Sequence, residues 1–324
     1  MSELSLVTLD HLDHSQVHEL QGLLSAATES DGVRPLSEHV WLHVIHGGDE
    51  ESQHLLARGP SGNLVGYAHL DTTDAVEGPS AELVVHPQHR QRGVGRELVT
   101  SLLGNADGRL RLWAHGEHIA ATKLAQALKF ERHRTLWQMR RSLHASLPEA
   151  RFPAGIDITT FEVGVDEQPV LTLNAQAFAQ LPDQGSWTLE DLQLREKEAW
   201  FDPAGFLLAW DENRELAGFH WTKVHGAHRH VGHEHVGHEH GTGLHQQAHT
   251  HEAIGEVYVL AVAPTWQGTG LGRSFTLAGL HHLRRLGLDQ VMLFVDASNL
   301  AAIRLYESLG FVRWDTDVMY RSGV

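Results

Sequence analysis

Apolar runs that end at a proline and lead into glycine-rich turns mark the second half of the chain. Residues 257–263 are apolar and rich in β-branched side chains, which predicts a buried strand that Pro264 terminates. Residues 267–273 read QGTGLGR, and beyond them apolar residues recur at helical spacing. We therefore expect a strand, a turn containing Gly268 and Gly270, and a helix that begins near Arg273.

The first half of the chain carries the same arrangement. Pro87 corresponds to Pro264 at an offset of 177 residues, and a Gly-x-Gly turn follows each proline at the same distance. Further along, residues 112–130 match residues 293–311 at an offset of 181. Because this period is far too long for a solenoid repeat, we expect two tandem domains of one fold.

A domain boundary is expected between the two copies. The segment HASLPEARFPAGIDI, residues 144–158, contains two prolines and no periodic apolar pattern, which is typical of a linker. We predict an N-terminal domain over residues 1–143, a linker over 144–154 and a C-terminal domain over 155–324. A length of 324 residues suits two domains with separate cores.

Composition narrows the class of protein. Hydrophobic residues make up 41% and charged residues 20% of the chain, as in globular proteins. The formal net charge of −16 argues against wide nucleic-acid or membrane contact, although it allows a local cationic pocket. The absence of cysteine excludes disulfides and a thiol nucleophile. The N-terminus lacks signal-peptide features and no apolar run reaches membrane length, so we expect a cytoplasmic protein.

The two glycine turns have the composition of an anion-binding site. Glycine lets the backbone approach a ligand closely, and the first N–H groups of the following helix attract negative charge. Arg273 adds a positive charge after the second turn, and Arg90, Arg92 and Arg96 do so around the first. A tight turn without a ligand is the alternative, but recurrence of the pattern with flanking arginines favours a ligand. The spacing is not that of the dinucleotide fingerprint G-x-G-x-x-G.

The spacing Gln/Arg-x-x-Gly-x-Gly resembles the pyrophosphate loop of the GNAT acetyltransferases, which bind acetyl-CoA. In the second copy, Asn299, Tyr306 and residues 310–311 resemble the late helix of that family, with its asparagine near the cofactor and its tyrosine near the thioester sulfur. The resemblance covers residues 5–143 and 155–322. It implies that the fold class is α/β (α+β) and that the chain is a tandem repeat of two GNAT acyltransferase folds. Each fold would be a mixed central sheet flanked by helices, and acetyl-CoA would be the donor substrate.

Acetyl transfer from a thioester to an amine needs a neutral amine, a stabilised oxyanion and a proton for the departing thiolate. In the aligned motif Tyr306 would donate that proton, and Glu256 would accept the proton of the amine, directly or through water. A backbone N–H on the strand 260–262 would hold the oxyanion, as in the wider family. Core packing of Tyr306 and simple solvation of Glu256 are the structural alternatives. No catalytic metal is expected, because a thioester is already activated.

The first copy lacks both catalytic groups. At the offset of 181 Tyr306 aligns with Ala125, and at the offset of 177 Glu256 aligns with Pro79. We therefore expect the N-terminal domain to bind a CoA without reacting, and the C-terminal domain to be the catalyst.

Eight strings spread over most of the chain resemble the mycothiol synthases, two-domain GNAT enzymes of actinobacteria. They are DGVRPLSEHV, AELVVHP, LWAHG, QMRRSL, NAQAFAQLPDQGSWT, EAWFDP, GFHWTKVH and GEVYVLAV. That family acetylates the cysteinyl amine of Cys-GlcN-Ins, giving mycothiol and CoA. Position by position, the resemblance implies substrate contacts at Glu38, Asp183, Lys223 and Glu256. Phe294 departs from the pattern, because a tyrosine that touches the substrate is expected there.

The same resemblance implies two sets of CoA contacts. In the C-terminal domain these are Leu260, Ala261, Val262, Gln267, Gly268, Thr269, Gly270, Leu271, Gly272, Arg273, Asn299, Leu300, Ala301, Ala302, Ile303 and Arg304. In the N-terminal domain they are Leu83, Val84, Val85, Gln91, Arg92, Gly93, Val94, Gly95 and Arg96. Since no cysteine is available to carry an acetyl group, we expect direct transfer in a ternary complex.

A histidine-rich insert at about 225–253 separates two of the matching strings. Ten of the 27 histidines fall between His225 and His251, and VGHEH occurs twice. No subset has the spacing of a tetrahedral metal site, so a low-complexity loop is the favoured interpretation and a metal buffer or sensor the alternative. We assign no metal site here. One hypothesis is that metal binding to the insert gates the acceptor cleft.

Two other functions stay open from the sequence. One is N-acetylation of another small-molecule or peptide amine on the same fold. The other, of a different class, is a non-catalytic protein that responds to acyl-CoA or to metal, against which the presence of Glu256 and Tyr306 argues. We expect a small-molecule partner rather than nucleic acid or membrane. A monomer is expected, since a tandem repeat can supply the pairing that single-domain GNAT proteins gain by dimerising.

Overall fold

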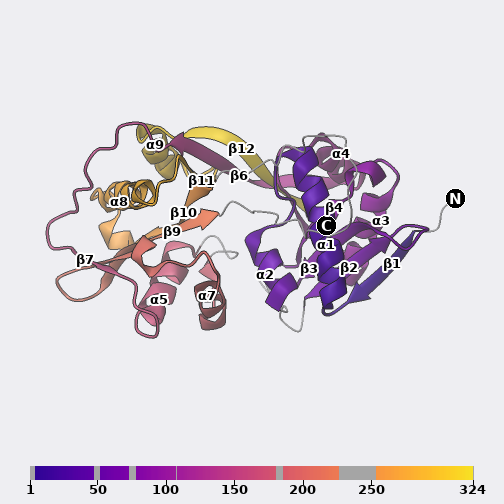
Figure 1. Ribbon diagram of the computed structural model, residues 1–324, viewed down its shortest axis with the longest axis horizontal. Helices are drawn as coiled ribbons and strands as arrows, with labels where there is room; N and C mark the ends of the chain where they lie inside the picture. The colour runs from indigo at the N-terminus through magenta and orange to yellow at the C-terminus, as the bar shows by residue number, and fades with distance from the viewer. Residues whose placement is uncertain are drawn as a thin grey trace, which may run out of the picture. The chain divides into compact units, whose positions relative to one another are not determined.

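The computed structural model describes six stretches of the chain, residues 4–46, 52–72, 78–106, 108–179, 185–225 and 253–323 (Figure 1). Contacts between Cα atoms divide the chain into two compact units. Unit 1 comprises Met1–Met139, Val295–Ser308 and Arg313–Val324, and unit 2 comprises Arg140–Phe294 and Leu309–Val312. Among the described residues, no helix is long and apolar enough to cross a membrane.

Unit 1 is built on a mixed sheet. Its strand order is β1 (Ser5–Leu9), β2 (Gln53–Arg58), β3 (Leu64–Asp71), β4 (Ser80–Val85), β5 (Arg111–Ala114), β12 (Val312–Ser322) and β6 (Phe130–Ser142). Strands β1 to β4 pair antiparallel, β4 and β5 pair parallel, and β5 and β12 pair antiparallel. The helices are α1 (His14–Asp31), α2 (Glu38–His46), α3 (Val94–Asn105), α4 (Ile119–Ala127) and α9 (Leu300–Ser308), with the 3-10 turn η1 (Pro87–His89).

The middle of strand β2 is apolar on both faces because each face packs against a helix. On β2, Leu55 and Ala57 belong to the core that contains Leu98 of α3. The residue between them, Leu56, belongs to a second core together with Leu20 of α1. Successive side chains of a strand point to opposite faces, so a strand covered on both sides reads as an unbroken apolar run.

Unit 2 repeats this plan. Its strand order is β11 (Gln290–Asp296), β10 (Ile254–Val262), β9 (Leu216–His225), β8 (Phe206–Trp210) and β7 (Asp157–Thr160). Strands β7 to β10 pair antiparallel, and β10 and β11 pair parallel. The helices are α5 (Glu167–Ala177), α7 (Leu189–Glu196) and α8 (Leu271–Arg285), with the 3-10 turns η2 (Pro203–Gly205) and η3 (Pro264–Trp266).

Helix α8 lies close to the sheet of unit 2 because β9 carries a glycine beneath it. A Cβ on Gly218 would lie 2.8 Å from the ring of Phe275 and 2.9 Å from the carbonyl oxygen of Ala261. Real Cβ contacts do not come this close, so a side chain at Gly218 would push α8 away from β9 and β10. This contact sets the position of the turn that leads from β10 into α8.

The last strand of the chain belongs mainly to unit 1, where it pairs with a strand far from it in sequence. Val318 of β12 stands opposite Ala114 of β5, and the ladder continues to Arg321 opposite Arg111. The compact units therefore differ from the predicted ranges 1–143 and 155–324, since residues 295–308 and 313–324 cluster with unit 1. The predicted ranges also describe the boundaries of the two repeated halves of the sequence, and in that sense they stay a prediction.

Candidate active site

Strand β10 contains a register shift where its counterpart β4 runs straight. The pairing of β10 with β9 shifts between Val257 and Val259, which makes Tyr258 an extra residue, as in a β-bulge. In unit 1, β4 pairs with β3 in unbroken register from Val85 to Ser80. Bulges bend a strand and re-aim its side chains, and they are frequent beside active sites. The bulge is thus a difference between β10, which carries Glu256, and its counterpart β4 in unit 1.

The predicted donor residues on β10 lie where its pairing with β11 has ended. The parallel ladder runs from Gly255 opposite Val291 to Val257 opposite Leu293. Beyond it, β10 continues along β9 on its other edge through Leu260, Ala261 and Val262. In unit 1 the ladder of β4 with β5 ends at Glu82, which gives the same position to Leu83, Val84 and Val85. Backbone groups beyond a ladder can hydrogen-bond a ligand.

The turn after β10 has a conformation that glycine permits. Gly268 has a φ of +77° and Gly270 a φ of +93°, both in the left-handed region. Gly270 is the N-cap of α8, and within the described residues no side chain caps that helix. The N–H groups of a first helical turn lack intrahelical partners and attract anions. The predicted residues that shape this turn and the start of α8 are Gln267, Gly268, Thr269, Gly270, Leu271, Gly272 and Arg273.

Unit 1 has a closely similar turn before α3. Gln91 has a φ of +57°, and Gly93, the N-cap of α3, has a φ of +92°. The guanidinium of Arg90 donates to both carboxylate oxygens of Asp31 at 2.7 Å, and its Nε donates to the carbonyl oxygen of Val85 at 3.1 Å. Arg90 therefore ties the turn to α1. The other predicted CoA residues of this turn are Arg92, Val94, Gly95 and Arg96, of which both arginines are exposed.

Glu256 is a buried carboxylate with a histidine beside it. Its residue is 6% exposed and stands opposite Lys223 in the pairing of β10 with β9. The Nε2 atom of His225 lies 2.7 Å from Oε2 of Glu256. Because alternate residues of a strand share a face, Lys223 and His225 project to the same side of the sheet. Sequence analysis missed the contact of His225 with Glu256, although the two-residue spacing from Lys223 was a signal for it.

An aromatic cluster surrounds Lys223 on this face. The Nζ atom of Lys223 lies 4.3 Å from the ring centroid of Trp200 and 5.2 Å from that of Tyr258. Arg195 donates from Nε to the Tyr258 hydroxyl at 2.8 Å, and its guanidinium lies 4.4 Å from the ring centroid of Trp187. Burial raises the pKa of Tyr258, against the opposing effect of Arg195. Aromatic faces beside hydrogen-bonding tips suit a ligand with both ring surfaces and hydroxyl groups.

Tyr306 lies in α9, within unit 1. The turn before α9 is held by Asp296, which accepts from Nε of Arg134 at 2.6 Å. Oδ1 of Asn299 accepts from the backbone N–H of Ala302 at 3.1 Å and so caps the helix. Tyr306 is 7% exposed, and burial raises its pKa to about 12, so the phenol keeps its proton at neutral pH. The remaining predicted CoA residues of α9 are Leu300, Ala301, Ile303 and Arg304.

Comparison with known proteins identifies the family. Residues 173–311 match the acetyltransferase (GNAT) family, and residues 50–133 match the acetyltransferase (GNAT) domain. The chain is 50% identical to the mycothiol acetyltransferase of Streptosporangium roseum over 96% of this chain and 97% of that protein. It is 53% identical to the mycothiol acetyltransferase of Acidothermus cellulolyticus over 93% of this chain and 89% of that protein. The chain belongs to the mycothiol acetyltransferase family.

Solved structures have the same architecture. A tandem GNAT protein from the clavulanic acid biosynthesis pathway matches with a TM-score of 0.71 and 19% identity, over 99% of this chain and 98% of that one. A GCN5-related N-acetyltransferase from Sphaerobacter thermophilus matches with a TM-score of 0.66 and 22% identity, over 98% of this chain and 95% of that one. These likenesses concern the fold. The predicted tandem of two GNAT folds and the predicted family are confirmed.

The two GNAT folds of the chain differ at the two predicted catalytic positions. Helices α4 and α9 both have nine residues at an offset of 181, so buried Ala125 takes the place of Tyr306. The bulge adds one residue to β10, and the register therefore places Ser80, not Pro79, at the position equivalent to Glu256. The alignment was one residue off because it contained no gap at the bulge. Neither counterpart is a carboxylate or a phenol.

The other predicted substrate residues are placed as follows. Glu38 is the first residue of α2 in unit 1, and Phe294 of β11 in unit 2 is 41% exposed. Asp183 lies outside the described residues, as do residues 226–252 of the histidine-rich insert. Over the described part of the chain, no group of three or more histidine or carboxylate side chains is arranged to hold a metal ion.

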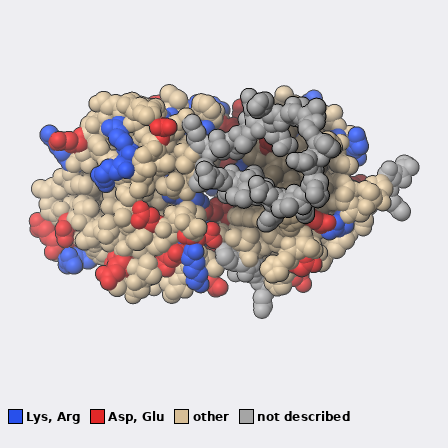
Figure 2. Space-filling view, in the orientation of Figure 1, with Lys and Arg blue, Asp and Glu red and all other residues tan. Residues whose placement is uncertain are grey.

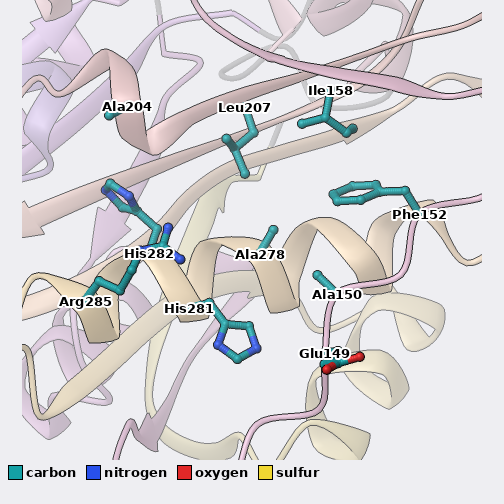
Figure 3. A pocket seen from close by; sticks show the side chains of 10 residues that line it. All are labelled: Glu149, Ala150, Phe152, Ile158, Ala204, Leu207, Ala278, His281, His282 and Arg285. Carbon is teal, nitrogen blue, oxygen red and sulfur yellow. The ribbon is translucent and has the colours of Figure 1, made fainter.

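A pocket of about 490 Å³ lies elsewhere in unit 2, against the C-terminal half of α8 (Figure 3). Its lining includes Phe152, His281, His282 and Arg285, and none of the predicted site residues is part of it.

The face drawn in Figure 2 has acidic and basic side chains interspersed. The overall charge of −16 therefore says little about any one ligand site, where local groups decide.

Proposed function

We propose that this protein transfers the acetyl group of acetyl-CoA to the cysteinyl amine of Cys-GlcN-Ins, with mycothiol and CoA as products. The observation that carries this proposal is 50% identity with a mycothiol acetyltransferase over nearly the whole of both chains. The bulged strand β10, which carries a buried carboxylate, and the glycine turn before α8 support it, since they provide a backbone edge and an anion-binding conformation.

In this proposal acetyl-CoA binds along the donor residues of the C-terminal half. The pyrophosphate lies against the turn at 267–273, where the N–H groups at the start of α8 and the charge of Arg273 attract it. The thioester carbonyl points to the edge of β10 at 260–262, beyond the ladder with β11. A backbone N–H there would stabilise the oxyanion of the tetrahedral intermediate.

The reaction needs two proton transfers. The amine nitrogen attacks the thioester carbon, the C–N bond forms, and the C–S bond then breaks. Glu256 accepts the proton that the nitrogen loses, and Tyr306 donates a proton to the departing sulfur. Both side chains regain their starting states by exchange with water. An α-amino group has a pKa near 8, so a weak base suffices.

The raised pKa of Tyr306 limits how it can act. A pKa of about 12 lies well above the value of about 8.5 typical of a thiol, so complete proton transfer to a free thiolate is unfavourable. Tyr306 therefore acts first as a hydrogen-bond donor to the sulfur, and its proton moves as the C–S bond breaks. Hydrogen bonding to developing negative charge strengthens in the transition state.

The acceptor carries many hydroxyl groups and one cationic amine, which suits the chemistry of the predicted substrate residues. Carboxylates at Glu38, Asp183 and Glu256 can accept from hydroxyls and from the ammonium group, and Lys223 can donate. Phe294 has no hydroxyl, so the contact that a tyrosine would make there is missing or comes from another residue. The aromatic cluster around Lys223 offers ring faces for a sugar.

The N-terminal half is proposed to hold a CoA without turning it over. Its turn with Gln91 and Gly93 keeps the anion-binding conformation, and its strand edge at 83–85 lies beyond the ladder with β5. Ala125 and Ser80 stand where Tyr306 and Glu256 stand in the other half, so these two positions supply neither a phenol nor a carboxylate for transfer.

The test is release of CoA from acetyl-CoA with Cys-GlcN-Ins as acceptor, with the product identified by mass. Tyr306→Phe and Glu256→Gln are each expected to lower kcat by about 100-fold or more. Tyr320→Phe is the matched control, because Tyr320 is also 7% exposed and bonds Thr122 at 3.0 Å. Exposed Glu162→Gln serves the same purpose for the carboxylate. Both controls are expected to retain wild-type kcat.

Two results would contradict the proposal. Absence of mycothiol with wild-type protein would reject the acceptor, and a panel of other amines would then decide between another N-acetyltransferase and a protein that binds acyl-CoA without turnover. Wild-type kcat in Tyr306→Phe or Glu256→Gln would reject that residue's role and leave the acceptor assignment standing.

A monomeric protein in the cytoplasm completes the proposal. The tandem arrangement of two GNAT folds places both halves in one chain, which removes the need for a second copy. Light scattering during gel filtration checks it, and a mass near twice 36.0 kDa would reject the monomer.

A further inference from the structure

The contact between His225 and Glu256 is a polar feature of unit 2 that the proposed mechanism leaves unused. His225 is the last residue of β9, and its Nε2 lies 2.7 Å from Oε2 of Glu256. The side chain of His225 is 24% exposed and that of Glu256 is 8% exposed. The histidine thus lies between a buried carboxylate and solvent.

The short distance fixes where a proton lies. A carboxylate oxygen and a ring nitrogen are both acceptors when unprotonated, so they approach to 2.7 Å only with a proton between them. With Glu256 ionised, that proton is on Nε2 of His225, and the N–H donates to Oε2. Such a charge-assisted hydrogen bond is stronger than a neutral one and holds the carboxylate in one orientation.

A general base must aim one lone pair at the proton that it removes. A carboxylate with one oxygen held by an N–H donor offers its other oxygen in a fixed direction. We propose that His225 is a positioning residue for Glu256. It holds Oε2, and the amine's proton moves to Oε1 while the Nε2–H bond stays intact. This inference rests on the proposed role of Glu256 as the base.

Two substitutions of His225 separate its N–H donor from its ring. His225→Gln keeps an N–H donor at similar reach, whereas His225→Phe keeps the ring and removes the donor. His225→Phe is expected to lower kcat by about 10- to 100-fold, with KM for both substrates within about twofold of wild type. His225→Gln is expected to recover most of that loss. His281→Phe is the control, because His281 lies on α8 outside the site and the change removes its 2.8 Å hydrogen bond to the Pro148 carbonyl.

A double-mutant cycle separates this role from a structural one. In a Glu256→Gln background, His225→Phe is expected to cause no further loss of kcat, since the base that it positions is gone. Multiplicative losses, or equal losses in His225→Gln and His225→Phe, would overturn the proposal. Normal kcat in Glu256→Gln alone would instead reject the proposed base, which makes the two failures distinguishable.

A measurement without substrate completes the test and does not depend on the acceptor. The ¹⁵N resonances of the His225 ring are expected to show a protonated Nε2 at neutral pH, and this signal should shift in Glu256→Gln. An unprotonated Nε2 in the wild-type protein would overturn the positioning role, whatever amine the enzyme acetylates.

Discussion

Raising the pH is expected to weaken unit 1 through a single buried histidine. His115 follows β5, and its Nδ1 lies 3.1 Å from Asp317 while its Nε2 lies 3.3 Å from Glu82. Burial disfavours a charged imidazole, but the two carboxylates outweigh that effect and raise the pKa of His115 to about 10. Because Asp317 is on β12, the charged triad helps to hold the last strand of the chain beside β5.

The magnitude follows from proton linkage. An unfolded histidine releases its proton near pH 6.5, whereas folded His115 keeps it up to about pH 10. Between these values the folded state binds one more proton, so the free energy of unfolding falls by about 1.4 kcal/mol per pH unit as pH rises. Over about 3.5 pH units the loss is about 5 kcal/mol. The stabilisation is fully present below about pH 6.5 and absent above about pH 10.

The assay combines titration with unfolding. Imidazole resonances followed by NMR should show His115 protonated well above pH 8, and Asp317→Asn should lower its pKa. Urea unfolding of wild type and His115→Gln should show a stability difference that shrinks as the pH is raised from 6 to 10. Titration of His115 between pH 6 and 7, or a difference that does not change with pH, would refute the reasoning.

Three further changes have expected outcomes. Gly270→Ala forces a residue with a side chain into a φ of +93° and should raise the KM for acetyl-CoA by about tenfold. Gly93→Ala in the other half should leave turnover unchanged, and steady-state kinetics of both variants tests this difference. Leu98→Ala empties a fully buried site of unit 1 and should lower the free energy of unfolding by about 2–5 kcal/mol in urea titrations, so a change below 1 kcal/mol would contradict the packing. The carboxyl pKa of Asp31 is held low by Arg90 against the effect of burial, so Arg90→Gln should raise it in a ¹³C titration, and an unchanged pKa would count against the ion pair.

The local structure of the candidate site could be predicted where it depends on a short continuous motif. The turns at Gly93 and Gly270 and the helix with Tyr306 could be recognised because each depends on neighbouring residues and recurs in the chain. The partners of these residues were not foreseen. Arg90 binds Asp31, 59 residues away, and His225 binds Glu256, 31 residues away. A hydrogen bond between distant residues leaves no local pattern in a single sequence.

The sequence by itself determined the repeated strand–turn–helix unit, because apolar periodicity and glycine conformation are local properties of the chain. It also indicated the family, through the resemblance of eight short strings. Only the tertiary structure decided that β12 pairs with β5, because this pairing joins residues far apart in the sequence, and the contact of Asp317 with His115 stabilises it. It also decided that Ser80 is the counterpart of Glu256, because a bulge is a property of two paired strands and not of one.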